Sequence, residues 1–169
     1  ESMPVSNRDE DKLATVIMTG VTAMVRATAK EMEIKGVLYP GEDVREILRE
    51  ADITHISNEI PFYSYCPEPQ WTQDTLKFCS APRYIDLLLD IGTDVVDLTG
   101  DHFADFGSEA MYETLDIYKE NNLPYFGGGR DIEEAKTPVK FEVNGNKIAF
   151  IGCNGKEAGY ATVSHSNPG

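Results

Sequence analysis

Long apolar runs, cysteines and basic residues are all scarce in this chain of 169 residues. No stretch approaches the length of a membrane span, and no signal peptide is visible at its start. Only 15 lysines and arginines stand against 29 aspartates and glutamates, which gives a net charge of −14. A surface this acidic repels phosphate backbones, so the composition argues against nucleic-acid binding. Attraction of cations or basic partners and simple solubility both remain open as explanations.

Several motifs that would identify an enzyme class are missing as well. The sequence contains no serine nucleophile elbow, no glycine-rich dinucleotide fingerprint and no phosphate-binding loop. Its three cysteines lack the close spacing of a zinc site. Cys66 and Cys79 bracket a proline-rich stretch, where a short disulfide loop or two free thiols would fit. We favour the disulfide.

What the chain does contain is the pattern of one α/β domain. The apolar fraction of 41% and charged fraction of 26% are typical of a folded protein. Short β-branched runs alternate with amphipathic segments, which predicts a mainly parallel sheet with crossover helices. The expected strands are 13–18, 53–57, 95–98 and 123–126, and the expected helices are 24–35, 42–51, 82–91 and 108–121.

The end of the chain has a different character. Asn144-Gly145 separates the segments 139–143 and 147–153, and this dipeptide between apolar runs predicts a β-hairpin. We therefore place the folded domain at residues 13–153, with a flexible N-terminus at 1–12. Residues 154–169, rich in glycine, serine and asparagine, are expected to be a loop or the truncated continuation of the domain.

Polar residues follow the expected strands at the point where each strand ends. Ser57-Asn58-Glu59 follows the second strand, and Gly100-Asp101-His102 follows the third. Because parallel strands end at the same edge of a sheet, these side chains should meet there. Carboxylates suit hard divalent cations and imidazole suits transition metals, so a metal site is one interpretation. In the other, Glu59 pairs with a nearby cation, Asp101 caps a turn and His102 is simply exposed.

At these residues the sequence resembles a known family. The run 92–102, followed by Asp105-Phe106-Gly107 and Thr114-Leu115, resembles the bacterial poly-γ-glutamate capsule biosynthesis (CapA-type) family. Further similarity lies at residues 127–130 and 144–150, so the resemblance covers most of residues 13–153. It implies an α/β, calcineurin-like metallophosphatase fold. That fold is an αββα sandwich, of which this chain would be the N-terminal portion with a mainly parallel sheet and a C-terminal β-hairpin.

The resemblance also implies roles for individual residues. Glu59 and Asp101 correspond to metal ligands, with Mn, Zn or Mg as the cation. His102 and Asp105 correspond to catalytic positions, and Arg26 and Asn58 to substrate-binding positions. Two departures weigh against a working metal centre. Val21 stands where the family has a metal-binding aspartate, and the family's later histidine-rich motif has no counterpart here.

Two functional hypotheses follow from the resemblance. One is a metal-dependent hydrolase or phosphoesterase in the synthesis of a capsule or cell-envelope polymer. The other is a non-catalytic relative that binds the polymer or an envelope assembly partner, so enzymatic activity stays an open question. The implied partners are a small molecule or an anionic envelope polymer, without nucleic acid, and a homo-oligomer is also open. The implied location is the cell envelope or the extracellular space.

Overall fold

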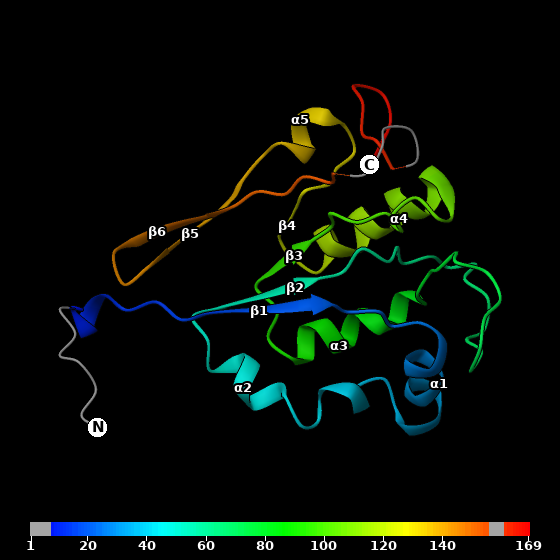
Figure 1. Cartoon of the computed structure of the whole chain (residues 1–169), viewed down its shortest axis with the longest axis horizontal. Helices are drawn as coiled ribbons and strands as arrows, with labels where there is room; N and C mark the ends of the chain where they lie inside the picture. The colour runs from blue at the N-terminus through cyan, green and yellow to red at the C-terminus, as the bar shows by residue number, and fades with distance from the viewer. Residues whose placement is uncertain (1–7, 156–160) are drawn as a thin grey trace.

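A computed structural model describes residues 8–155 and 161–169, which form an α/β domain (Figure 1). Four parallel strands make the central sheet, in the order β1-β2-β3-β4. Their bounds are Val16–Val21, Ile53–Ser57, Val95–Asp97 and Tyr125–Phe126. Since the strands are parallel and follow each other in the sheet as in the chain, their carboxyl ends meet at one edge. The expected parallel sheet is confirmed.

Helices cover one face of this sheet. They are α1 (Arg26–Lys35), α2 (Arg45–Arg49), α3 (Ile85–Asp90) and α4 (Gly107–Glu120), with 3-10 turns at Tyr39–Gly41 and Pro82–Tyr84. Apolar side chains at helical spacing on α3 and α4 pack against inward-facing residues of β2 and β3, which gives the main core. Its members include Leu88, Leu115, Tyr118, Ile56 and Val96.

A β-hairpin packs on the opposite face. β5 (Val139–Val143) and β6 (Asn146–Phe150) pair antiparallel, as expected from the sequence. Asn144 and Gly145 both have positive φ, the requirement of the tight turn that joins such strands. A second apolar cluster joins Phe150 to Ile53, Val95 and Phe126 of the sheet. The described chain is thus a helix layer, a parallel sheet and a hairpin, and the short α5 (Ile132–Ala135) precedes the hairpin.

Several elements differ from the sequence-based expectation. The second hairpin strand, expected at 147–153, ends at Phe150, and the helix expected at 82–91 begins with a 3-10 turn. The first strand begins at Val16 rather than at residue 13, because the Thr15 N–H donates to the Asp52 carboxylate before the ladder starts. The second helix spans Arg45–Arg49 rather than 42–51, because residues 39–41 form a 3-10 turn ahead of it. The fourth strand begins after Pro124, since proline has no N–H to donate to a sheet.

The segment between β2 and the 3-10 turn at Pro82–Tyr84 carries no helix or strand, and a disulfide closes part of it. Cys66 and Cys79 are bonded, with sulfur atoms 2.04 Å apart, which confirms the expected pairing. We call residues 66–79 the disulfide loop. Beyond the loop, an isolated parallel bridge joins Phe62 to Ser80 and brings the two ends of the segment together.

The two ends of the chain are described only in part. Glu10–Lys12 forms a 3-10 turn, whereas residues 1–7 of the expected flexible N-terminus lie outside the described residues. Residues 154–155 and 161–169 contain no helix or strand, and residues 156–160 also lie outside the description. Gly169 exchanges two backbone hydrogen bonds with Gly129. Of the helices in the described ranges, none is both long and apolar enough to cross a membrane.

Candidate metal centre

The loop after β2 carries two polar residues, Asn58 in the core and Glu59 at the edge of the sheet. Asn58 is fully buried, and its side-chain N–H donates to the Tyr118 hydroxyl at 2.7 Å. Its backbone N–H donates to the Asp97 carbonyl, which ties the loop to β3. Glu59 comes next and is partly exposed at the strand ends. The structure therefore gives Asn58, an expected substrate-binding residue, a packing role and presents Glu59 to the site.

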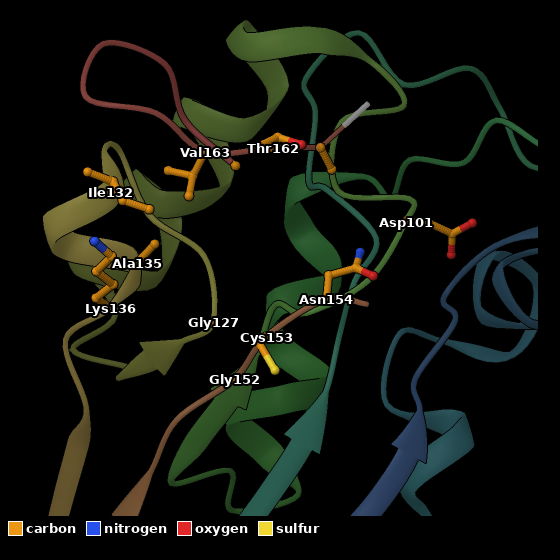
Figure 2. A pocket seen from close by; sticks show the side chains of 12 residues that line it. Asp101, Gly127, Ile132, Ala135, Lys136, Gly152, Cys153, Asn154, Thr162 and Val163 are labelled. Atoms are coloured by element: carbon orange, nitrogen blue, oxygen red, sulfur yellow. The ribbon is translucent and has the colours of Figure 1, made fainter. Parts of the chain in front are cut away.

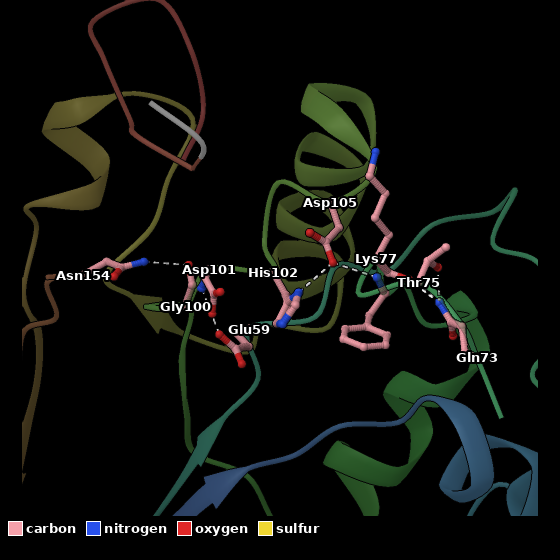
Figure 3. Close-up of polar contacts among 10 residues, drawn as sticks. Glu59, Gln73, Thr75, Lys77, Gly100, Asp101, His102, Asp105 and Asn154 are labelled. Carbon is pink, nitrogen blue, oxygen red and sulfur yellow. Dashed lines mark hydrogen bonds and ion pairs between the residues drawn. The ribbon is translucent and has the colours of Figure 1, made fainter. Parts of the chain in front are cut away.

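The loop after β3 wraps closely around the Glu59 carboxylate. The Asp101 backbone N–H donates to Glu59 Oε2 at 3.0 Å (Figure 3). A Cβ atom on Gly100 would lie 1.7 Å from the same oxygen, so only glycine leaves room for Glu59. On the other side, the Asn154 side chain donates to the Gly100 carbonyl at 2.9 Å. The loop is thus held between Glu59 and the segment that follows the hairpin.

His102 is oriented by a buried carboxylate. Its Nδ1 lies 2.7 Å from Asp105 Oδ2, and Asp105 is only 7% exposed. The same Oδ2 accepts the Phe78 backbone N–H at 2.7 Å, and the Phe78 ring packs edge-on against the imidazole. An ionised Asp105 can only accept, so Nδ1 carries the proton and Nε2 is the atom available to a ligand. The disulfide loop therefore fixes the histidine through Asp105.

Glu59, Asp101 and His102 come together as the sequence predicted. One ligand atom from each lies within 4.8 Å of the others. Two carboxylates and an imidazole, whose second nitrogen is held by another carboxylate, make a donor set that suits Zn or Mn better than Mg. Val21 ends β1 opposite Ser57 and is exposed, so its apolar side chain adds no ligand from the first strand. The residues present fit one cation, held from the ends of β2 and β3.

A cavity of about 580 Å³ opens beside Asp101 (Figure 2). Gly127 and Gly152 bring two backbone segments together at its base, where a Cβ on Gly152 would lie 3.0 Å from the Gly127 Cα. Asp101 and Asn154 stand at one end and Ile132 at the other. The remaining lining residues are Ala135, Lys136, Cys153, Ala161, Thr162, Val163 and Gly169. The cavity thus has a largely apolar wall and reaches Asp101, a residue of the candidate centre, at one end.

Arg26 lies on the opposite side of His102 from this cavity. Its guanidinium carbon is 4.6 Å from the centroid of the Phe78 ring, whose centroid is 4.7 Å from that of His102. Apart from the buried Asn58, the expected site residues therefore fall into two groups. Glu59, Asp101, His102 and Asp105 form the centre, and Arg26 stands one aromatic ring away.

Sequence reasoning missed Phe78 and Asn154. Both reach the site through long-range hydrogen bonds, from Phe78 to Asp105 and from Asn154 to Gly100, across 27 and 54 residues of chain. No local pattern marks such contacts. The one available signal for Phe78 was its place beside Cys79, because a disulfide holds its neighbours in position.

Comparisons with known proteins give relatives that are all named for capsule synthesis or PGA biosynthesis. The model of a family described as "Bacterial capsule synthesis protein PGA_cap" matches residues 15–168. "Capsule biosynthesis protein CapA" of Bacillus anthracis is 25% identical over 167 residues, which cover 98% of this chain and 40% of that protein. "PGA biosynthesis protein CapA" of Bacillus subtilis (strain 168) is 25% identical over 143 residues, covering 84% and 37%. The chain spans about two fifths of the length of these relatives.

Proposed function

Because this chain belongs to the bacterial capsule synthesis protein (PGA_cap) family, which has a metallophosphatase-like fold, we propose that it acts on an anionic capsule or cell-envelope polymer. The relatives are named for capsule and PGA biosynthesis, which supports a poly-γ-glutamate-like polymer as substrate or ligand. The proposed activity is metal-dependent hydrolysis at the centre formed by Glu59, Asp101 and His102. The observation that carries it is the convergence of two carboxylates and one imidazole at the strand ends, with one polar atom of each within 4.8 Å of the others.

Glu59 and Asp101 are the proposed metal ligands. Their carboxylates come from neighbouring strand ends, and the Asp101 N–H bonded to Glu59 holds one of them in place. When bound, the cation supplies positive charge that polarises a phosphoryl or carbonyl oxygen of the substrate. Without a third carboxylate at position 21, we expect one cation rather than a pair.

His102 is the proposed proton donor. With Nδ1 bonded to Asp105, the ring directs Nε2 toward the same space as the two carboxylates, and a proton held on Nε2 is the one to be donated. That proton can pass to the leaving atom as the scissile bond breaks, the oxygen of a phosphoester or the nitrogen of an amide. Water adds its hydroxyl group to the phosphorus or carbonyl carbon, and its second proton leaves to solvent. Asp105 acts as a positioning residue, because it stabilises the imidazolium and fixes the plane of the ring.

The site's surroundings support a polymer better than a free small ion. The cavity beside Asp101 encloses about 580 Å³, which is in the size range of organic-ligand pockets. A disulfide suits an oxidising compartment, which supports a location at the cell envelope or outside the cell.

Metal titration tests the centre directly. Calorimetry with Mn²⁺ should show one binding site per chain, and Glu59→Gln should weaken the affinity by about tenfold or more, since it removes a charged ligand. Glu133→Gln, at an exposed residue of α5, should bind as the original chain does. Protein that retains neither Mn²⁺ nor Zn²⁺ would remove the proposed mechanism.

The His102→Ala variant distinguishes two possible roles of His102, proton donor and metal ligand. A donor role predicts that hydrolysis of a chromogenic phosphodiester falls by about 10²- to 10⁴-fold while Mn²⁺ affinity is unchanged. If the affinity falls together with the rate, the imidazole is a third ligand, and the assignment of His102 as acid is wrong.

A non-catalytic polymer-binding role is the second candidate. The observation that favours it is Val21, which leaves β1 without the ligand that the family has there. Binding of Mn²⁺ without any turnover of phosphodiester or polymer would select this second function.

A further inference from the structure

A second cavity lies under the disulfide loop, and its lining includes Phe106, the residue after Asp105 in the chain. It encloses about 260 Å³, between the start of α1 and the loop closed by Cys66 and Cys79. Its polar lining consists of Arg26, Glu68, Gln70, Gln73 and Lys77. The metal centre already described uses none of these five side chains, so the cavity is a separate feature of the chain.

Arg26 has the most unusual environment in this cavity. Its Nε atom is buried and has no hydrogen-bond acceptor within the described part of the chain. Its guanidinium lies over the Phe78 ring, and it forms no ion pair with a carboxylate of the described residues. Four other arginines in the same description pair with carboxylates, namely Arg45, Arg49, Arg83 and Arg130. In a chain with a large excess of acid, a guanidinium left without a carboxylate points to an acceptor from outside.

The backbone at Arg26 supports this interpretation. Its φ is +50°, a left-handed conformation that is costly for a residue with a long side chain. The strained residue is the first of α1, and Val25 before it makes no side-chain cap. Strain of this kind persists where surrounding structure holds a side chain in a required place, and here that place is the cavity wall.

The charges in the cavity favour an anion. Lys77 is exposed and has no ion pair among residues 8–155 and 161–169. Arg26 and Lys77 together outweigh Glu68, the one carboxylate in the lining. The side-chain amides of Gln70 and Gln73 already donate to acceptors within the disulfide loop, so the two cations are the groups left for an anion. Arginine binds carboxylates through paired N–H groups, so a carboxylate is the ligand that this arrangement fits.

The two cavities flank the metal centre on opposite sides. The first begins at Asp101, and the second begins at Arg26, beyond the Phe78 ring that touches His102. Figure 3 shows the same order, with Asn154 on one side of Asp101 and His102, and with Lys77 and Gln73 on the other. A ligand that fills both cavities must run across the centre.

We propose that the Arg26 cavity is a carboxylate subsite for an extended anionic polymer, whose chain crosses the Glu59–Asp101–His102 centre between the two cavities. This inference rests on the proposed function and adds the substrate's form. The ligand is a chain with carboxylates on successive units, bound at an internal position, rather than a single acidic molecule.

Fluorescence anisotropy with labelled γ-linked oligoglutamate tests the subsite on the full chain in the presence of Mn²⁺. We expect the oligomer to bind with higher affinity than free glutamate, whose affinity is measured by competition. Arg26→Gln should weaken the affinity for the oligomer by about 10- to 100-fold. The same oligomer with its carboxylates converted to carboxamides should bind weakly to both proteins. Arg83→Gln, at an arginine paired with Glu33, is the matched control and should leave binding unchanged.

The outcomes separate the subsite from the metal centre. Thermal unfolding and Mn²⁺ affinity of Arg26→Gln should match the original chain, which shows that the fold and the centre are intact. If Arg26→Gln then binds the oligomer normally, or if the carboxamide oligomer binds as well as the acid, the carboxylate subsite is wrong. If free glutamate competes as well as the oligomer, the extended path is wrong. Either result, with normal Mn²⁺ binding, leaves the proposed function standing.

Discussion

His55 and His102 show how differently one residue type is used in this chain. His102 is partly exposed at the strand ends, and Asp105 orients it. His55 is 3% exposed in β2, between the rings of Phe126 and Phe150. Neither of its ring nitrogens has a hydrogen-bond partner in the described chain. Burial lowers the pKa of His55, and the nearby Asp97 carboxylate offsets this only in part. The difference follows from position, because His55 falls inside an apolar strand and His102 follows one.

The lowered pKa of His55 predicts acid sensitivity of the fold. In the unfolded chain histidine titrates near pH 6.5, so the unfolded state takes up a proton before the folded state does. The stability that neutral His55 provides is complete above about pH 6.5 and is lost as the pH falls toward the folded-state pKa. The Tm should therefore decrease from about pH 7.5 to about pH 5.5.

Calorimetry of two variants assigns this effect. His55→Phe keeps an aromatic ring and cannot titrate, so its Tm should fall less over the same range. His165→Gln, at an exposed residue, should retain the full pH dependence. Equal pH dependence in His55→Phe and the original chain would show that carboxylates, not His55, govern it.

Among the helices and strands, hydrophobic periodicity predicted the elements whose position depends mainly on the local sequence. The second strand, the hairpin and the long α4 appear where alternation or helical spacing placed them. The positions of β1 and α2 shifted, because contacts with distant residues decide where a ladder or a helix begins. The path of the disulfide loop was not predictable, because its link to the site is a backbone N–H that any residue at position 78 except proline would supply.

Loss of the Cys66–Cys79 bond should destabilise the whole domain. A cross-link over 13 residues limits the unfolded chain and is expected to contribute about 2–4 kcal/mol. The Cys66→Ser/Cys79→Ser double variant should unfold at lower urea concentration, and a reducing agent should shift the original chain in the same direction. Cys153→Ser, at the free and exposed cysteine, should remain sensitive to reductant. A double variant as stable as the original would mean that the loop contributes nothing to stability.

The charge of the whole molecule sets a problem for a polymer-binding protein. A net charge of −14 repels a polyanion, so an anionic polymer must approach the protein against its negative electrostatic potential. Arg26 and Lys77 attract the polymer only at short range. The fold class and the three-residue cluster were predictable from sequence, but this conflict between overall charge and local charge was not, because it depends on which cations lack partners in the folded chain.

Salt should therefore speed association of the labelled oligoglutamate. The screening length falls from about 30 Å at about 0.01 M salt to about 8 Å at about 0.15 M, which removes most of the long-range repulsion. Stopped-flow anisotropy should show the association rate constant rising by about tenfold over this range. The carboxamide oligomer serves as control and should show no such rise. A rate that falls with added salt would show that an attractive surface, not the net charge, controls the encounter.

Gly100 is a position in the metal centre where no other amino acid fits while Glu59 keeps its place. Even the smallest side chain there would overlap Glu59, although Gly100 itself touches neither metal nor substrate in the proposed mechanism. Most glycines in loops can be exchanged at modest cost, whereas this one can change only if Glu59 moves out of the centre. Survival of substitutions at position 100 in a genetic selection thus reports whether the cell needs Glu59 in its present position.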